Sequence, residues 1–318
     1  MVVGRVSRRN IWEGRQVSRK TLSVKFKVFF EKIVPVGEVW RLLPPTLTND
    51  KSPWILAIDG KWLKRQGVVM IYRDITHGEN LFWSFHQSES YQALSDDLSQ
   101  LVRLLDGNSP LGVVSDWKGS IKAGIIRYLG EDTPHQRCLA HVTREANRLL
   151  PRKSSFRAIL VLREIAKELP YIKLRNEERC WKGELIKWEM AFGHLLKEKT
   201  IDRDVNGPKK WWYTHGDLRR AWRLLTDDWY PFFVHLAYLP TTTGQDPLIP
   251  NTNNSIEGVN SQLKNKLLNH RGMKTTQQVS FIYWYLTFTR TKSKQDLKKL
   301  WGLWKKQKTP ILDTQKVT

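Results

Sequence analysis

The chain has 318 residues, 40% of them hydrophobic and 11% aromatic, so it can bury a real core, and wholesale disorder is excluded. Its 53 Lys and Arg against 31 Asp and Glu leave a net charge of +22, which favours a polyanionic partner, nucleic acid before a ribosome or an acidic membrane. Two cysteines give no disulfide framework, and the longest apolar stretch, Val279–Thr289, is far short of the ~20 residues that a membrane helix needs. We therefore expect a cytoplasmic, nucleoid-associated protein with no membrane partner.

Residues 1–50 are basic and predict at least one helix. Ser18 is a plausible N-cap, and apolar side chains follow it at helical spacing up to Phe30. This helix could be the recognition helix of a helix-turn-helix, in which case Arg19 and Lys20 would contact DNA. An ordinary amphipathic helix with a solvated basic face explains the pattern equally well.

Residues 51–150 alternate strands and helices. Three apolar runs separated by turn residues predict an antiparallel meander: Trp54–Asp59, Val68–Asp74 and Leu81–Phe85. Further strands are expected at Leu111–Asp116 and Pro134–Cys138, and helices at Tyr91–Leu105, Lys118–Leu129 and Ala140–Leu150. Three antiparallel strands joined to two parallel ones make a mixed five-stranded α/β sheet.

Residues 151–250 are expected to be an all-helical insertion rich in tryptophan. The helices predicted there are Arg157–Leu169, Glu177–Leu196 and Asp217–Leu225. Core packing is the default role of these tryptophans. Trp211 and Trp212 follow two lysines in a loop-like stretch, so they are the pair that could instead stack on unpaired bases of DNA.

Residues 251–291 are expected to hold the last two core helices, and residues 292–318 a basic C-terminal tail. The two helices are predicted at Asn254–Leu268, capped by Asn254 or Ser255, and at Gln277–Thr291.

Three acids lie at the places where a metal site would form. Asp59 and Asp116 end the first and fourth strands, and Glu257 lies in the first turn of the helix after the insertion. Such carboxylates can converge on Mg²⁺, and two ions can support in-line phosphoryl transfer. Each acid also has a structural explanation: Asp59 in a turn, Asp116 as a helix cap and Glu257 as a partner of its helix dipole.

The glutamate helix carries a polar face suited to DNA. Glu257, Asn260 and Lys264 recur at helical spacing, so they share one face, and Lys266 and Arg271 extend its basic character. Such a face would offer a carboxylate to metal and amide and ammonium groups to phosphate. A merely solvated polar face is the alternative.

Several blocks resemble those of the Mutator-type superfamily of bacterial insertion-sequence transposases. Ile58-Asp59-Gly60 resembles its first acidic block and Val113-Val-Ser-Asp116 its second. Asn251-Thr-Asn-Asn-Ser-Ile-Glu-Gly-Val-Asn260 resembles its third. Gln136-Arg-Cys138-Leu-Ala-His141 resembles the Cys-x-x-His motif that follows the second. The resemblance covers about residues 52–290. Relatives carry a fuller DNA-binding region before the core, so the resemblance leaves a truncated N-terminus open.

The resemblance implies an RNase H-like core with a large insertion and a DDE-type transposase that cleaves transposon ends and transfers the 3′-OH into target DNA. It implies that Asp59, Asp116 and Glu257 are both the catalytic residues and the ligands of two Mg²⁺ ions, which Mn²⁺ could replace. Cys138, His141, Asn254 and Asn260 would support the site. Because zinc usually needs four ligands, a packed cysteine and a hydrogen-bonding histidine explain the Cys-x-x-His motif better than a zinc site.

The expected partner is double-stranded DNA, as terminal inverted repeats and as target, bound by a homodimer or higher oligomer. Two alternatives remain at this stage. One is a catalytically inactive, transposase-derived DNA-binding protein, and the other is an RNase H-like nuclease.

Overall fold

A computed structural model describes residues 18–50, 52–64, 66–201, 211–238, 248–268 and 273–306 of the chain. These residues fall into two compact units. The first is drawn from Met1–Val113, Lys118–Thr133 and Asn254–Thr318, and the second from Val114–Trp117 and Pro134–Asn253.

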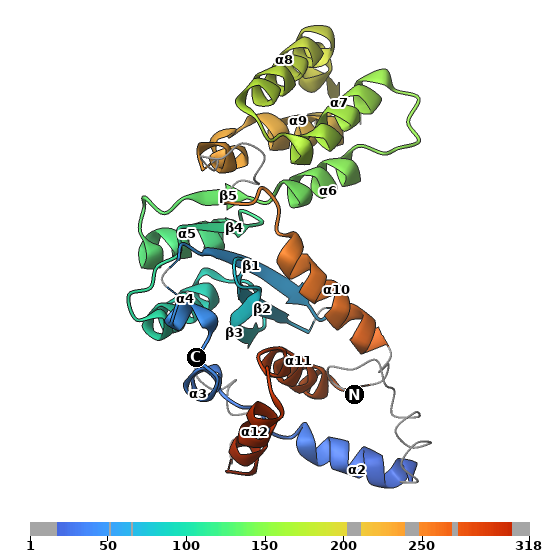
Figure 1. The fold of residues 1–318 in the computed structure, drawn as a ribbon. Coiled ribbons are helices and arrows are strands. Elements are labelled where there is room, and N and C mark those ends of the chain that lie inside the picture. Colours follow the sequence, from blue (N-terminus) through green and yellow to red (C-terminus); the bar gives the residue numbers. More distant parts are fainter. Residues whose placement is uncertain are drawn as a thin grey trace. The chain divides into compact units, whose positions relative to one another are not determined.

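A mixed five-stranded sheet is the centre of the fold (Figure 1). Its strands are β1 (Ile55–Trp62), β2 (Val68–Asp74), β3 (Glu79–His86), β4 (Gly112–Ser115) and β5 (His135–Arg137). They are ordered β3-β2-β1-β4-β5, with β1, β2 and β3 antiparallel and the remaining pairings parallel. The mixed α/β sheet predicted from the sequence is thus confirmed.

The strands form where the sequence places apolar runs on both faces of the chain. In β1 every residue from Ile55 to Asp59 is buried, and exposure begins only at Gly60. The register sets Asp59 opposite Ile71 of β2, inside the sheet rather than at a free end. A central strand is therefore covered on both faces, as its continuous hydrophobic run requires.

Helices cover the two faces of this sheet in the first unit. α4 (Tyr91–Leu105) packs on β3 and on α5 (Gly119–Leu129), while α10 (Asn254–Leu268) packs on β1 and α11 (Thr275–Thr289) on β3. Figure 1 shows α4 and α5 on one side of the strands and α10 and α11 on the other. Ile256 and Leu263 are the buried residues of α10, and they join the core cluster of the sheet.

The N-terminal and C-terminal helices also pack on this core. They are α2 (Arg19–Phe29), α3 (Val36–Leu42) and α12 (Lys294–Lys306), with a short 3-10 turn at Thr46–Thr48. Ser18 caps α2 as predicted, because its hydroxyl accepts a hydrogen bond from the Thr21 N–H at 3.1 Å. Phe29 contacts the rings of Trp284 and Trp304 at centroid distances of 4.7 and 5.7 Å.

The second unit is mainly helical. Its helices are α6 (Leu139–Leu149), α7 (Arg157–Glu168), α8 (Arg175–Phe192) and α9 (Gly216–Thr226), with 3-10 turns at Leu169–Tyr171, Gly193–Lys197, Tyr230–Phe232 and Val234–Ala237. Its tryptophans mostly pack in the core, as expected: Trp181 and Trp188 are 2% exposed, and the Trp188 ring stacks on Trp222 at 4.8 Å.

Two local predictions differ from the structure. The stretch expected to be all helical also contains an antiparallel pair, β6 (Lys199–Ile201) and β7 (Trp211–Tyr213), so Trp211 and Trp212 lie in a strand rather than a loop. The basic tail contains helix α12, because Leu300 recurs at helical spacing with Leu297 and Trp304 and is buried. The strands of the pair have only three residues each, which is too few for a measurable period.

Candidate active site

Asp59 is nearly buried in β1, and both of its carboxylate oxygens accept hydrogen bonds. Its exposed fraction is 9%. Oδ1 accepts from the Gly60 N–H at 2.9 Å, and Oδ2 accepts from the Asn260 amide at 2.7 Å. A charged group this buried requires such partners, since an uncompensated carboxylate would be costly. The predicted first acid and a predicted supporting residue are therefore brought together.

Helix α10 carries Glu257 and is fixed to the sheet by polar contacts as well as by its apolar face. The guanidinium of Arg73 in β2 donates to the Ser255 hydroxyl at 2.8 Å and to Asn80 Oδ1 at 3.0 Å. Glu257 is half-buried in the first helical turn, three residues before Asn260, where a negative charge is favoured by the helix dipole. The same face thus presents Glu257 and the amide that holds Asp59.

One amide oxygen at this place is buried without a partner among the described residues. The amide of Asn260 is oriented by its donation to Asp59, so its Oδ1 is directed elsewhere. That Oδ1 is buried and, among the described residues, has no hydrogen-bond partner. A buried acceptor without a partner is costly, so this amide oxygen is a candidate position for a polar ligand or a bound water.

Asp116 directly follows β4, the neighbour of β1 in the sheet, and belongs to the second unit. The next residue, Trp117, has φ +69°, an unusual left-handed conformation for a bulky side chain. Hydrogen bonds hold the turn: Ser115 Oγ accepts from the Trp117 N–H at 3.2 Å and lies 2.7 Å from His135 Nε2. The Trp117 ring packs on His135 at 4.4 Å. Backbone strain of this kind concentrates at functional sites.

Arg137 lies within electrostatic range of Asp116 in the same unit. Burial lowers the pKa of its guanidinium, while the charges of Asp116 and Asp228 oppose that shift. Its Nε is buried and has no hydrogen-bond partner among the residues that the structure describes. The second aspartate therefore lies beside a charged donor that the sequence reasoning did not single out.

Cys138 connects several segments of the second unit. It is fully buried, and its backbone N–H donates to the Ser115 carbonyl at 2.7 Å. Its Sγ accepts from the Asn253 N–H at 3.2 Å, and its carbonyl accepts from the His141 N–H at 3.1 Å at the start of α6. These bonds suit a packing role that fixes the turn after β4.

The remaining predicted residues lie on exposed or partly exposed surfaces. Lys264 and Asn254 are exposed on α10, Lys20 is exposed on α2, and the ammonium of Lys266 lies 5.6 Å from the Tyr285 ring centroid. Trp211 and Trp212 are 53% and 51% exposed, with the Lys199 ammonium 4.0 Å from the Trp211 ring centroid. Arg271 and the side chain of Arg19 lie outside the described residues.

Glu89 is an acid that the sequence reasoning missed. Its side chain is only 7% exposed and forms an ion pair with Lys118. Its Oε1 occupies the space beside Gly60: a Cβ built there would lie 2.2 Å from that oxygen and 2.9 Å from a methyl of Val68. A serine-flanked glutamate before a helix resembles a cap in sequence, so no pattern marks its position against β1.

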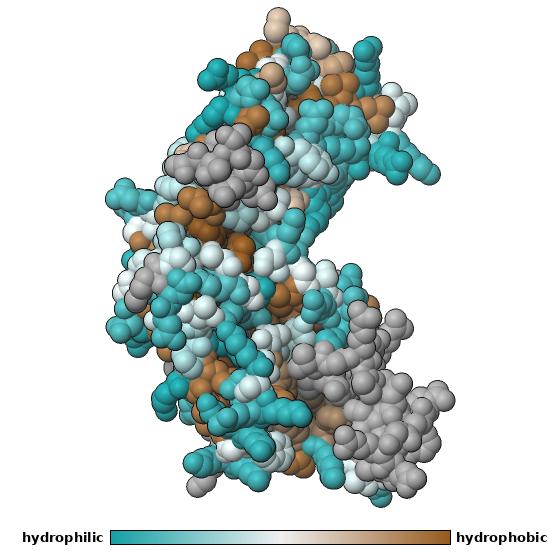
Figure 2. Space-filling model, in the orientation of Figure 1, coloured by the Kyte–Doolittle hydropathy of each residue, from teal (hydrophilic) through white to brown (hydrophobic). Residues whose placement is uncertain are grey.

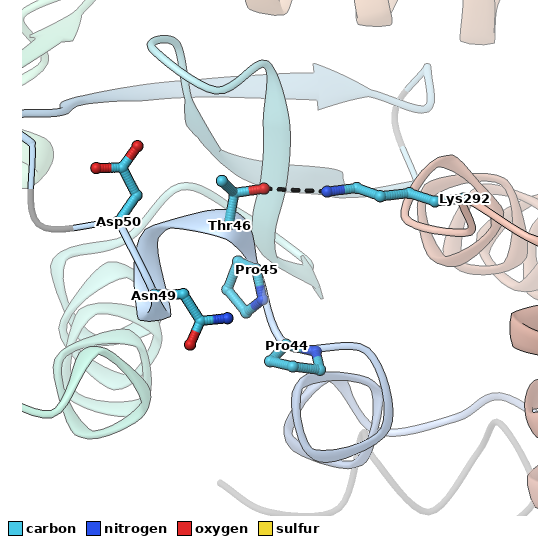
Figure 3. A pocket seen from close by; sticks show the side chains of 6 residues that line it. All are labelled: Pro44, Pro45, Thr46, Asn49, Asp50 and Lys292. Carbon is cyan, nitrogen blue, oxygen red and sulfur yellow. Dashed lines mark hydrogen bonds between the residues drawn. The ribbon is translucent and has the colours of Figure 1, made fainter.

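A surface hollow among the described residues lies away from these acids. It has a volume of about 560 Å³ and is lined by Pro44, Pro45, Thr46, Asn49, Asp50 and Lys292 (Figure 3). Its single cation, Lys292, donates to Thr46 at 3.0 Å and pairs with Glu79 at 2.8 Å. Because that charge is already compensated, the hollow adds no second candidate for an anion site.

No protein-family model matches this chain, and no curated protein sequence matches it. Within the described residues, no helix is long and apolar enough to cross a membrane. Hydrophilic side chains cover much of the face seen in Figure 2.

Proposed function

We propose that the chain is a DDE-type DNA transposase with an RNase H-like core, in which Asp59, Asp116 and Glu257 bind two Mg²⁺ ions. The observation that carries the proposal is the hydrogen bond from Asn260 to Asp59, which fastens the glutamate helix to the strand of the first aspartate. The two sequence blocks that it joins are the ones that resemble the first and third acidic blocks of Mutator-type transposases.

The order of the elements supports this proposal. A three-stranded meander, a helix and two further strands precede a long helical stretch, and α10 and α11 then return to the sheet. On this interpretation the helices from α7 to α9 form a large insertion that interrupts an RNase H-like core before its last helices.

The proposed carboxylate ligands would allow metal-assisted phosphoryl transfer. Bound Mg²⁺ would activate a water or a 3′-OH and stabilise the leaving oxygen in phosphoryl transfer. Asp59 is held in one orientation by Gly60 and Asn260 and so is preorganised as a ligand. Lys264, two turns after Glu257 on the same helix face, would hold the DNA backbone beside the carboxylates.

DNA is the proposed partner. The net charge of +22 supplies the long-range attraction, and helix α2 contains basic but no acidic residues. The substrate would be the terminal inverted repeats of a mobile element and its target DNA, bound by a dimer or higher oligomer. Binding should weaken steeply with salt because bound phosphates release counterions.

The test is strand transfer by variants that keep side-chain shape and remove charge. Asp59→Asn, Asp116→Asn and Glu257→Gln should each lower cleavage and strand transfer on DNA from the flanks of the gene by at least 10³-fold, the scale of a lost principal catalytic group. DNA binding should persist. Asp132→Asn, an exposed acid elsewhere in the first unit, is the matched control and should act as wild type.

The same assay separates the alternatives. Wild-type binding with no Mg²⁺-dependent or Mn²⁺-dependent cleavage would identify a transposase-derived DNA-binding protein. Cleavage confined to RNA–DNA hybrids would identify an RNase H-like nuclease. Full activity of Asp116→Asn would reject the metal triad.

A further inference from the structure

We infer that Lys61 and Lys264 form a phosphate clamp beside Asp59 that takes one phosphodiester group of a DNA strand. The inference rests on the proposed function, which it deepens by assigning a site for the backbone next to the carboxylates. Lys61 is not part of the motif resemblance, and its position becomes informative only when β1 and α10 are seen together.

The hydrogen bond between Asp59 and Asn260 shows which faces of β1 and α10 meet. Side chains two residues apart in a strand point to the same face, so Lys61 lies on the face of β1 that carries Asp59. Residues four apart on a helix lie one above the other, so Lys264 lies on the face of α10 that carries Asn260. Both lysines therefore lie on the faces of β1 and α10 that meet at Asp59 and Asn260. The two elements pack together and are seen side by side in Figure 1.

The two lysines also lie at similar distances, along their own elements, from the residues that form the Asp59–Asn260 contact. Two strand residues advance ~6.6 Å and four helix residues ~6.0 Å. Lys61 and Lys264 therefore lie at similar distances along their elements from the Asp59–Asn260 contact. The charge of Lys264 does act on Lys61: burial first, and then repulsion by Lys264, lower the Lys61 pKa, while Asp59 partly opposes this shift.

Asp59 does not fully compensate this pair of cations. It carries one negative charge against their two positive charges, and its Oδ2 and Oδ1 also accept hydrogen bonds from the neutral Asn260 amide and Gly60 N–H. Two like charges that act on each other, one of them on a half-buried strand residue, are unfavourable by themselves. A phosphodiester between them would remove the repulsion, and lysine is a good point-charge donor to phosphate. The clamp would hold the backbone phosphate next to the one that reacts.

The experiment measures DNA binding without metal, so it does not depend on catalysis. Full-length wild type, Lys61→Gln, Lys264→Gln and the double variant are titrated with a 30-bp duplex in EDTA across a salt series. Each single variant should reduce the slope of log affinity against log salt by about 1, the value for one lost phosphate contact. Because the two lysines share one phosphate, the double variant should also lose about 1. A loss of about 2 would overturn the clamp.

Two control variants test whether the change in salt slope is specific to the clamp. Lys61→Arg keeps the charge and should restore the slope, which a fold defect at position 61 would not allow. Lys122→Gln removes an exposed lysine from α5, on the opposite side of the sheet, and should leave the slope unchanged. Equal slopes for Lys61→Gln and Lys122→Gln would refute the clamp.

A competition experiment distinguishes a DNA phosphodiester from free phosphate as the group that the clamp binds. Inorganic phosphate and NaCl are compared at equal ionic strength as competitors of the duplex. Equal competition means that the site needs a phosphodiester on a strand, as proposed. Stronger competition by phosphate against wild type but not against the double variant would assign the site to free phosphate and overturn the DNA assignment. The transposase proposal is judged separately, by the strand-transfer activity of the Asp116 variant.

Discussion

The side-chain amide of Asn260 donates a 2.7 Å hydrogen bond to Oδ2 of Asp59, although 201 positions separate the two residues in the chain. The bond joins a strand at the centre of the sheet to a helix formed late in the sequence. It orients a nearly buried carboxylate and leaves the amide oxygen of Asn260 as a further acceptor beside it.

Removing this amide should impair activity without unfolding the protein. Hydrogen bonds to charged groups contribute about 1.5–3 kcal/mol, so Asn260→Ala should lower strand transfer about 10-fold to 150-fold and raise the Mg²⁺ concentration needed for half-maximal rate. Asn265→Ala, an exposed position on the same helix, is the control. Unchanged kinetics in Asn260→Ala would show that the bond has no catalytic consequence.

A methyl group at position 60 should destabilise the first unit. The added Cβ would meet Glu89 Oε1 at 2.2 Å, a methyl of Val68 at 2.9 Å and the Met70 sulfur at 3.1 Å. Overpacking of this kind costs about 1–3 kcal/mol, so urea unfolding of Gly60→Ala should shift to lower denaturant. Gly302→Ala, in α12 with open space around the new methyl, should be neutral or stabilising. Wild-type stability of Gly60→Ala would contradict the packing of Glu89.

The pH dependence of stability should contain a contribution from His77. Burial lowers its pKa, but hydrogen bonds to Asp74 at 2.5 Å and Asp50 at 3.2 Å outweigh burial, so the pKa lies above its ordinary value of about 6.5. A raised folded-state pKa stabilises the fold fully below the unfolded value and loses that contribution as pH rises through the folded value. Urea unfolding from pH 5.5 to 8.5 should show this loss in wild type and not in His77→Gln.

The exposed tryptophans of β7 should matter only for DNA with unpaired bases. Trp211→Ala and Trp212→Ala should keep wild-type melting temperatures, since about half of each side chain is exposed. Stacking contributes about 1–3 kcal/mol per base, so each variant should bind ends with an unpaired base more weakly and full duplexes normally. Trp188→Ala, which removes a 2% exposed ring, should instead lose about 3–5 kcal/mol of stability. Equal binding of both DNA forms by all variants would remove the stacking role.

Most of the sheet and its covering helices could be predicted because their apolar residues form either a continuous run, as in a buried strand, or a helical period. The all-buried run of β1 and the Leu94 to Leu105 pattern of α4 are examples. The hairpin of β6 and β7 could not, because three-residue strands have no measurable period. Asp59 was predicted at the end of its strand, but β1 continues to Trp62, so Asp59 lies within the paired strand. Its partnership with Asn260 depends on tertiary packing alone.

Glu89 and Lys61 were missed because their importance also depends on tertiary packing. Glu89 matters because Gly60 leaves room for its carboxylate, and that room exists only in the folded sheet. Lys61 is one of many lysines and arginines in a chain of net charge +22, so composition does not distinguish it. Sequence patterns identify which groups a site could use, and packing decides which of them meet.

The separation between Asp59 and Asn260 also has a consequence for biosynthesis. The strand of the first aspartate is translated long before the helix that orients it, so the contact must close a loop of some 200 residues, among the slower events in folding. A nascent or prematurely ended chain that stops before Asn254 has the meander but not α10. On the proposed function, such a chain would have no competent site for cutting DNA, and activity would begin only when translation of the core is complete.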